Sequence, residues 1–325
     1  DANTAVGICS LFKTTTGGKN VGIGTCALIC NLTGEENTAV GFNALRETTT
    51  GGSNVAVGQD TMRCNTTGAS NTAVGREALC KNTTAANNTA VGKRALYVNT
   101  EGHTNVAIGK EALSANTTAN YNVAVGAQCL TDVTGNANVA LGFQSLFDLI
   151  SGANNIAIGQ WSAKAMHVGE SGNIALGSEA MSLADEGTAG GDIDNNIAIG
   201  VQAFQSGDLA GNDRQVVGNI AIGYRAVQGT ITNAQTGTIG IGHEALIALT
   251  SGTGATAVGY KSLNALVGGD GNTAMGYNSG LFLTFLENLT GIVGLLPDPY
   301  FSEGGFHRIT KDGYLDVHAD FSHSD

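Results

Sequence analysis

The chain has 325 residues, of which 48 are glycine, only 2 are proline and 13% are charged. Typical soluble domains are about one-quarter charged, so the surface must consist largely of Asn, Thr, Ser and backbone, which suits an exposed structural protein better than a metabolic enzyme. The formal net charge of −12, without a local basic patch, argues against binding to nucleic acid. No run of 18 apolar residues is present, so we expect no membrane span.

A nine-residue phrase, NTAVGFNAL at residues 37–45, recurs along most of the chain. The Gly that closes each AVG-like triplet, taken here as position zero, recurs every 17 residues at first, and later insertions collect at about residues 178–240. A fixed short period is the signature of a solenoid, in which each coil stacks on the next. The sixteen position-zero residues are Gly7, Gly24, Gly41, Gly58, Gly75, Gly92, Gly109, Gly126, Gly142, Gly159, Gly177, Gly200, Gly223, Gly242, Gly259 and Gly276.

Each position of the repeat has its own residue type. Position −4 is Asn in 14 of 16 copies, position −1 is always Val, Ile, Leu or Met, and position +4 is usually Leu. The alternation around NTAVG has the period of a strand, so we expect two short strands per coil. We expect the side chains at −1 and +4 to point into the coil. The small residues at −2 and +3 then leave room for a close backbone or a neighbouring chain, and Asn at −4 forms a hydrogen-bonded ladder.

The predicted fold is therefore all-β, a β-solenoid (β-roll) of about sixteen 17-residue coils over residues 1–280. With coils about 4.8 Å apart, the rod would be on the order of 75 Å long. Residues 281–325 lack the repeat and form a separate C-terminal segment, a candidate cap for the last coil.

The phrases NTAVGREAL, NVAIGKEAL and NIAIG resemble the head repeats of trimeric autotransporter adhesins. The longer pattern NTAVGxxALxxNTTG is similar to repeats in phage, giant-virus and bacterial surface fibres. This resemblance covers residues 3–280. It implies a β-roll, commonly left-handed and often trimeric, that displays an elongated attachment surface and has no catalytic residues.

The period, the low charge and this resemblance together favour a structural or adhesive fibre protein, extracellular or on a virion or cell surface. Its expected partner is itself, in a head-to-tail filament or a homotrimer, and a host-surface receptor or glycan is a further candidate. We expect no enzyme activity and no cofactor from the solenoid.

After Gly280, the segments LPDPYFSEGGFHRI and GYLDVHADF are similar to the opening part of the 2-oxoglutarate and Fe(II)-dependent dioxygenases related to prolyl hydroxylases. In that family an H-x-D pair supplies two iron ligands, which here would be His318 and Asp320. The third ligand and a basic residue for 2-oxoglutarate lie far downstream in the family, whereas this chain stops at Asp325. We therefore expect an incomplete site. The alternative function is a stalk for such a dioxygenase.

Six cysteines are present, and two pairs fall on adjacent coils. Cys9 and Cys26 both occupy position +2, one coil apart, and Cys64 and Cys80 differ by one position. A separation of about 4.8 Å lies within disulfide reach, so both pairs are predicted disulfides. The alternative is that all the cysteines are small packing residues in a reducing compartment.

N-x-T sequons predict glycosylation on one exposed stripe of the rod. Four of them lie at position +7, in the NTTG phrase that we expect to form an exposed turn. Asn and Thr also serve as turn formers without any modification, and this alternative stays open. The six candidates are Asn31, Asn65, Asn82, Asn87, Asn116 and Asn288.

Overall fold

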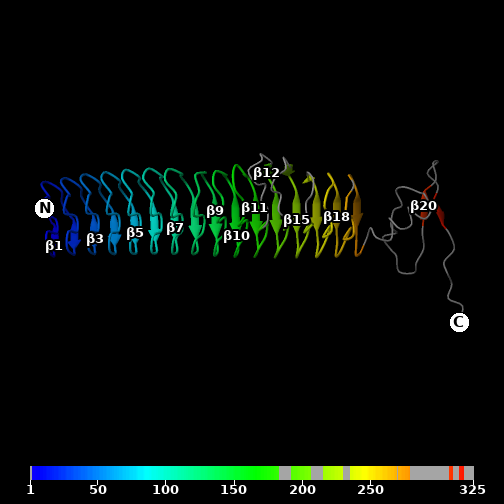
Figure 1. The fold of residues 1–325 in the computed structure, drawn as a ribbon, viewed down its shortest axis with the longest axis horizontal. Coiled ribbons are helices and arrows are strands. Elements are labelled where there is room, and N and C mark those ends of the chain that lie inside the picture. Colours follow the sequence, from blue (N-terminus) through cyan, green and yellow to red (C-terminus); the bar gives the residue numbers. More distant parts are fainter. Residues whose placement is uncertain are drawn as a thin grey trace, which may run out of the picture.

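The computed structural model describes residues 2–182, 192–205, 215–229, 235–268 and 270–278, together with the backbone of residues 307–309 and 315–317. The described residues between 2 and 278 form a straight rod of stacked coils, with β1 at one end and β19 at the other (Figure 1). Each coil contributes one three-residue strand to a parallel sheet of 16 strands, which runs the length of the rod. The all-β solenoid predicted from the repeat is confirmed.

The strands of this long sheet follow one another in chain order, apart from three strands that belong to a second sheet. They are β1 (Thr4–Val6), β2 (Val21–Ile23), β3 (Thr38–Val40), β4 (Val55–Val57), β5 (Thr72–Val74), β6 (Thr89–Val91), β7 (Val106–Ile108), β8 (Val123–Val125), β9 (Val139–Leu141), β10 (Ile156–Ile158), β11 (Ile174–Leu176), β13 (Ile197–Ile199), β15 (Ile220–Ile222), β17 (Ile239–Ile241), β18 (Thr256–Val258) and β19 (Thr273–Met275).

Two small sheets complete the strand inventory of the described residues. The longer coils of the predicted insertion region add a three-stranded parallel sheet of β12 (Asp192–Asp194), β14 (Gln215–Val217) and β16 (Gln235–Thr236). Near the C-terminus, β20 (His307–Ile309) pairs antiparallel with β21 (Leu315–Val317). The parallel pairing of the extra strands shows that the lengthened repeats keep the coil stacking.

The interior of the coil is narrow, and this reverses one prediction. From β2 onward the middle residue of each long-sheet strand, at position −2, is buried, as Ala107 is at 0% exposure. The residue at −1 points outward, as Ile108 does at 40%. The prediction that position −1 points inward was wrong because Leu at +4 already fills the coil. At Gly240, which occupies position −2, an added Cβ would lie 2.5 Å from a methyl group of Val227.

The second predicted strand per coil is also wrong for the 17-residue coils. Positions +2 and +4 adopt left-handed backbone conformations, for example Asn43 (φ 57°) and Leu45 (φ 51°), and such residues cannot continue a strand. A left-handed Leu costs about 1–2 kcal/mol, whereas full burial of its side chain contributes about 1.5–3 kcal/mol. Burial therefore outweighs the strain, and these segments still bond coil to coil, as Leu45 N–H does to Thr61 O at 3.0 Å.

The predicted asparagine ladder at position −4 is confirmed. Asn54 Oδ1 accepts hydrogen bonds from the main-chain N–H of Asn71 (3.0 Å) and from its Nδ2 (3.2 Å). Asn71 Nδ2 also donates to the carbonyl oxygen of Ala85 at 2.9 Å. Twelve such Asn residues are at most 1% exposed: Asn20, Asn37, Asn54, Asn71, Asn88, Asn105, Asn122, Asn138, Asn155, Asn173, Asn196 and Asn219.

The position-zero glycine makes the corner at which the chain leaves the strand. Its φ is 132° at Gly75, and an added Cβ would lie 2.7 Å from the carbonyl oxygen of Gly92 on the next coil. Both the left-handed backbone and the close approach of the next coil require glycine. The period of the sequence is therefore the spacing of these corners.

Candidate functional site

The long sheet presents an uncharged, mainly apolar surface to solvent, which we call the outer sheet face. It consists of the first and third residues of every long-sheet strand, positions −3 and −1. The first residues are all Val, Ile or Thr, and the third residues are all Val, Ile, Leu or Met. Several are more than one-third exposed, including Val74 (37%), Leu141 (43%) and Ile199 (36%). No charged side chain interrupts either row.

The outer sheet face is large for a monomer. Sixteen strands about 4.8 Å apart give a length of about 70 Å, and two side-chain rows give a width of about 10 Å, so the area is on the order of 700 Å². The largest apolar patch on a typical monomer is about 300–600 Å². A standard protein interface buries about 800 Å² per partner. The outer sheet face is therefore close in size to one side of such an interface.

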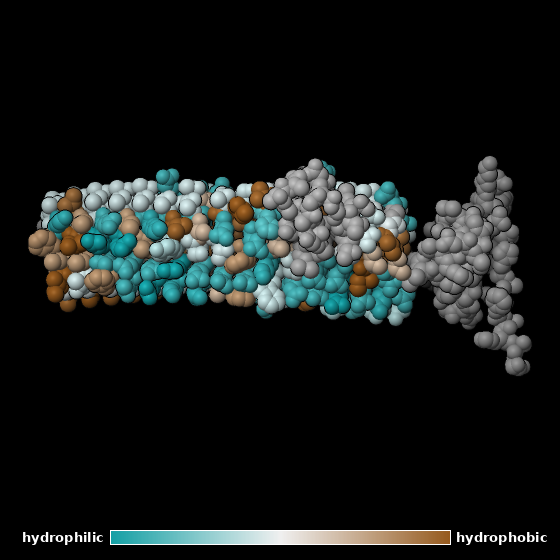
Figure 2. All heavy atoms as spheres, in the orientation of Figure 1, coloured by the Kyte–Doolittle hydropathy of each residue, from teal (hydrophilic) through white to brown (hydrophobic). Residues whose placement is uncertain are grey.

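Hydrophilic side chains cover much of the side of the rod shown in Figure 2, and apolar ones gather near its N-terminal end. At that end Val6 is 56% exposed, Ile8 is 72% exposed and Phe12 is 73% exposed. The N-terminal coil of the described rod thus exposes several large apolar side chains.

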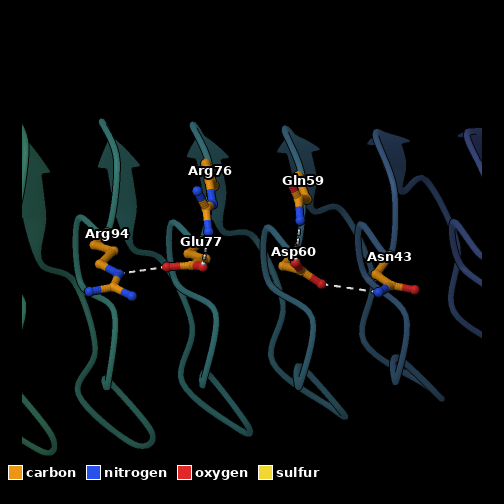
Figure 3. Close-up of polar contacts among 6 residues, drawn as sticks. All are labelled: Asn43, Gln59, Asp60, Arg76, Glu77 and Arg94. Atoms are coloured by element: carbon orange, nitrogen blue, oxygen red, sulfur yellow. Dashed lines mark hydrogen bonds and ion pairs between the residues drawn. The ribbon is translucent and has the colours of Figure 1, made fainter.

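A polar row occupies position +2, where the left-handed backbone places one side chain per coil. Figure 3 shows Asn43 Nδ2 donating to Asp60 at 3.0 Å, and Arg94 Nε donating to Glu77 at 2.6 Å, each across one coil spacing. The hydrogen bond from Arg94 holds the pKa of the Glu77 carboxyl below its usual value. Beyond it, Gln144 bonds to Gln128 at 3.1 Å. The row links successive coils and contains no acid–base pair isolated from solvent.

A column of stacked aromatic rings lies at position +1 near the C-terminal end of the rod. The ring centroids of Tyr224, His243, Tyr260 and Tyr277 follow at 5.1, 5.0 and 4.9 Å. Tyr260 stacks on His243 and on Tyr277, whereas Tyr224 is tilted by 36° to His243. Such ring contacts between coils stabilise the stack.

The cysteines do not form the predicted disulfides. All six are free thiols in the structure, so neither the Cys9–Cys26 nor the Cys64–Cys80 bridge is present. Cys64 N–H donates to the carbonyl oxygen of Cys80 at 3.0 Å, which confirms that these two lie on adjacent coils. Burial raises the pKa of Cys80 to about 11 and that of Cys129 to about 12. These two thiols are packing groups, in line with the alternative from the sequence.

Four of the predicted glycosylation sites are inside the coil. Asn31, Asn65, Asn82 and Asn116 are each 0% exposed, so the expectation that position +7 is exposed was wrong. The reason is a second interior ladder, in which Asn82 Nδ2 donates to Asn65 Oδ1 at 2.7 Å and to the carbonyl oxygen of Ala85 at 3.1 Å. A glycan on these amides would have no room in the folded coil.

The remaining predicted site residues are two glycosylation candidates and the two candidate iron ligands. Asn87 is exposed and remains a predicted glycosylation site. Asn288, His318 and Asp320 lie outside the described residues. Among the residues that the structure describes, no three His, Cys, Asp or Glu side chains are grouped so that they would hold a metal ion. No described helix has the length and apolar character needed to span a bilayer.

Comparisons with protein-family models, with curated proteins and with solved structures give no match. The class of this protein is thus defined by its fold alone: it is a parallel β-solenoid with a hydrogen-bonded asparagine ladder in its interior. The resemblances to surface-fibre repeats and to dioxygenases stay predictions.

Sequence reasoning missed the outer sheet face, although a signal for it was present. Most coils carry a β-branched residue on each side of a central Ala, as in Val55–Val57 and Ile156–Ile158. Such a triplet places two large apolar side chains on one side of the strand and a methyl group on the other. The large residues can therefore pack against something outside the coil.

Proposed function

We propose that this protein is the rod of an extracellular, virion-surface or cell-surface fibre, and that it associates laterally with further copies of itself through the outer sheet face. The observation that carries the proposal is the uncharged, mainly apolar surface that runs over sixteen strands. The proposal assigns the solenoid a structural and adhesive role and no catalytic one.

A second copy of the chain fits this face because its repeat matches. Side-chain rows on stacked coils are spaced by the strand separation of about 4.8 Å, and another copy has the same spacing along its whole length. Two such faces can interdigitate at every coil, as paired sheets do in a steric zipper. A partner without this period would match only a few coils.

The composition of the outer sheet face also favours a second copy of the chain as the partner. Val and Ile rows gain free energy when water is removed from them, and a face without charges carries no desolvation penalty for ions. Two faces packed back to back give a dimer, and three around a threefold axis give a homotrimer. The face thus favours a lateral oligomer over a purely head-to-tail filament.

Sedimentation analysis of the purified chain tests the proposal. We expect the wild type at micromolar concentration to sediment as a dimer or trimer. The variant Val91→Lys/Ile108→Lys/Val125→Lys should sediment as a monomer with an unchanged circular dichroism spectrum, because charges in the middle of the face oppose its burial.

A matched control places the same number of charges outside the outer sheet face. The variant Gln59→Lys/Ala127→Lys/Gln160→Lys, at position +1, should retain the oligomer. A wild type that is monomeric at tens of micromolar, or a control that dissociates as fully as the face variant, would overturn the proposal.

A further inference from the structure

We propose that three cations on successive coils, Arg76, Lys93 and Lys110, form a binding strip for a linear sulfated polysaccharide. This names a ligand class for the surface fibre proposed above and, as a biological role, rests on that function. The binding itself is a separate property of the rod and is tested separately.

The strip arises from the register of the solenoid. Each of the three residues occupies position +1, directly after a corner glycine, and they are 17 residues apart in sequence. Their coils are joined by backbone hydrogen bonds of 2.8 Å from Gly92 N–H to Val74 O and from Gly109 N–H to Val91 O. The three side chains therefore start from points about 4.8 Å apart, in a row along the rod axis.

The cations form the outer layer of this region, with carboxylates beneath them. The side chains of Arg76 and Lys110 are 55% and 58% exposed, whereas those of Glu77 and Glu111 are 14% and 26% exposed. Glu77 pairs with Arg76 at 3.1 Å and Glu111 with Lys110 at 3.8 Å. The carboxylates support the long side chains and leave their outer surfaces open to solvent.

The local charge is positive although the protein is acidic. Arg76, Lys93, Lys110 and Arg94, which bonds to Glu77 at 2.6 Å, are four cations against the two carboxylates Glu77 and Glu111, an excess of +2 in a chain of −12. Within the described part of the chain, Lys93 makes no ion pair. It lies between Arg76 and Lys110 with no carboxylate of its own.

Other rows of the rod place opposite charges on neighbouring coils. Lys19 pairs with Glu36 at 2.9 Å and Lys261 with Glu244 at 3.3 Å. Like charges directly opposite on paired strands destabilise a sheet, so a row of three cations works against the stacking that the rest of the rod supports. A bound polyanion removes that repulsion, which gives the strip a physical reason to exist.

The shape of the strip favours a single sulfated chain over duplex DNA. The row is one side chain wide and about 10 Å long, so a narrow linear polyanion can lie along it. Sulfate oxygens accept hydrogen bonds from guanidinium and ammonium groups, and such charge-assisted bonds are short and strong. A duplex presents a broad anionic surface, and that surface would also meet the acidic flanks, including Asp60 on the preceding coil.

The test measures binding of the full chain to dextran sulfate, neutral dextran and a 20-base-pair DNA duplex from about 50 to 200 mM NaCl, the range over which such contacts weaken. We expect binding to dextran sulfate alone. The variant Arg76→Gln/Lys93→Gln/Lys110→Gln should bind at least about tenfold more weakly and show a shallower salt dependence, since fewer counterions are released. Circular dichroism and melting verify that it folds.

The control Lys13→Gln/Lys19→Gln/Lys81→Gln has the same net charge as the strip variant but keeps the three cations of the strip. It should bind dextran sulfate within about twofold of the wild type, because direct contacts and not net charge decide the affinity. The inference is overturned if the control loses as much affinity as the strip variant, if the duplex binds as tightly as dextran sulfate, or if the wild type does not bind at low salt.

Sedimentation of the same samples separates this inference from the proposed function. An oligomer that does not bind dextran sulfate contradicts only the strip. A monomer that binds it contradicts only the lateral association.

Discussion

Asn71 donates its main-chain N–H to Asn54 Oδ1 at 3.0 Å, and its own Oδ1 accepts the main-chain N–H of Asn88 at 3.0 Å. Each amide thus satisfies the backbone of the next coil, inside a core where water cannot substitute for it. Replacement of one Asn therefore leaves the buried main-chain N–H of the next coil without a partner.

We expect Asn71→Ala to destabilise the rod by about 1–3 kcal/mol, because the buried main-chain N–H of Asn88 loses its partner and an unpaired buried group costs about this much. The carbonyl of Ala85 keeps its hydrogen bond from Asn82 Nδ2. Denaturant unfolding measures the change. The control is Asn87→Ala, at an exposed residue that directly precedes the ladder residue Asn88. This substitution should change stability by less than about 1 kcal/mol. Equal effects at the two positions would contradict the ladder.

Gly75→Ala should destabilise the fold by more than about 2 kcal/mol, because the new Cβ meets the next coil at 2.7 Å in a left-handed backbone. Gly254→Asn is the matched comparison. Gly254 also has a positive φ of 67°, but nothing lies within 4 Å of an added Cβ, and Asn tolerates this conformation. Thermal melting should show a large loss for the first variant and a small one for the second.

The inward and outward sides of a strand can be distinguished at Ala107 and Ile108. Ala107→Asp places a charge in the core and should prevent folding, since a buried unpaired charge costs several kcal/mol. Ile108→Asp should fold and weaken only the self-association. Circular dichroism with sedimentation separates these outcomes, and a folded Ala107→Asp rod would contradict the observed phase of the strand.

Burial protects two thiols from alkylation. The pKa of Cys129 is raised to about 12 and that of Cys80 to about 11, so both remain protonated at pH 8, and the thiolate is the reactive form. Mass spectrometry after brief maleimide treatment should find Cys9, which is exposed, labelled before both. Early labelling of Cys129 in the folded chain would contradict its position in the core.

The same pKa shifts predict the direction of alkaline unfolding. Because the folded thiols hold their protons more tightly than the reference value of 9.0, the unfolded state loses protons first. Stability is therefore unaffected by these groups below about pH 9 and falls as the pH rises from about 9 to about 12. Replacing both cysteines with Ala should flatten this part of the stability profile measured by denaturant unfolding.

The stacking of coils could be predicted because every coil repeats the same requirements. Gly at zero and Asn at −4 recur at a fixed period, and only a stack lets identical side chains meet. The phase of the strand could not be predicted as directly. Neither side of the triplet Thr38–Val40 carries a charge, and the width of the coil, already filled by Leu45, decides that Ala39 faces inward.

Local backbone conformation accounts for the other differences. Leu79 has a φ of 49°, a conformation that leucine rarely adopts, so composition gave no sign that this segment would not be a strand. The NTTG phrase has the residues of an exposed turn, yet the Asn65 amide turns inward to bond to the carbonyl of Gly68 at 3.0 Å. The basic strip, in contrast, could have been found from the sequence, because its three cations each directly follow a position-zero glycine.

Electron cryomicroscopy of the purified chain tests the central claim most directly, because it resolves both the rod and whatever contacts its outer sheet face. The account predicts two or three parallel-coil rods packed side by side, with the Val and Ile rows of positions −3 and −1 buried between them. Single rods with that face open to solvent, or rods joined only at their ends, would contradict it.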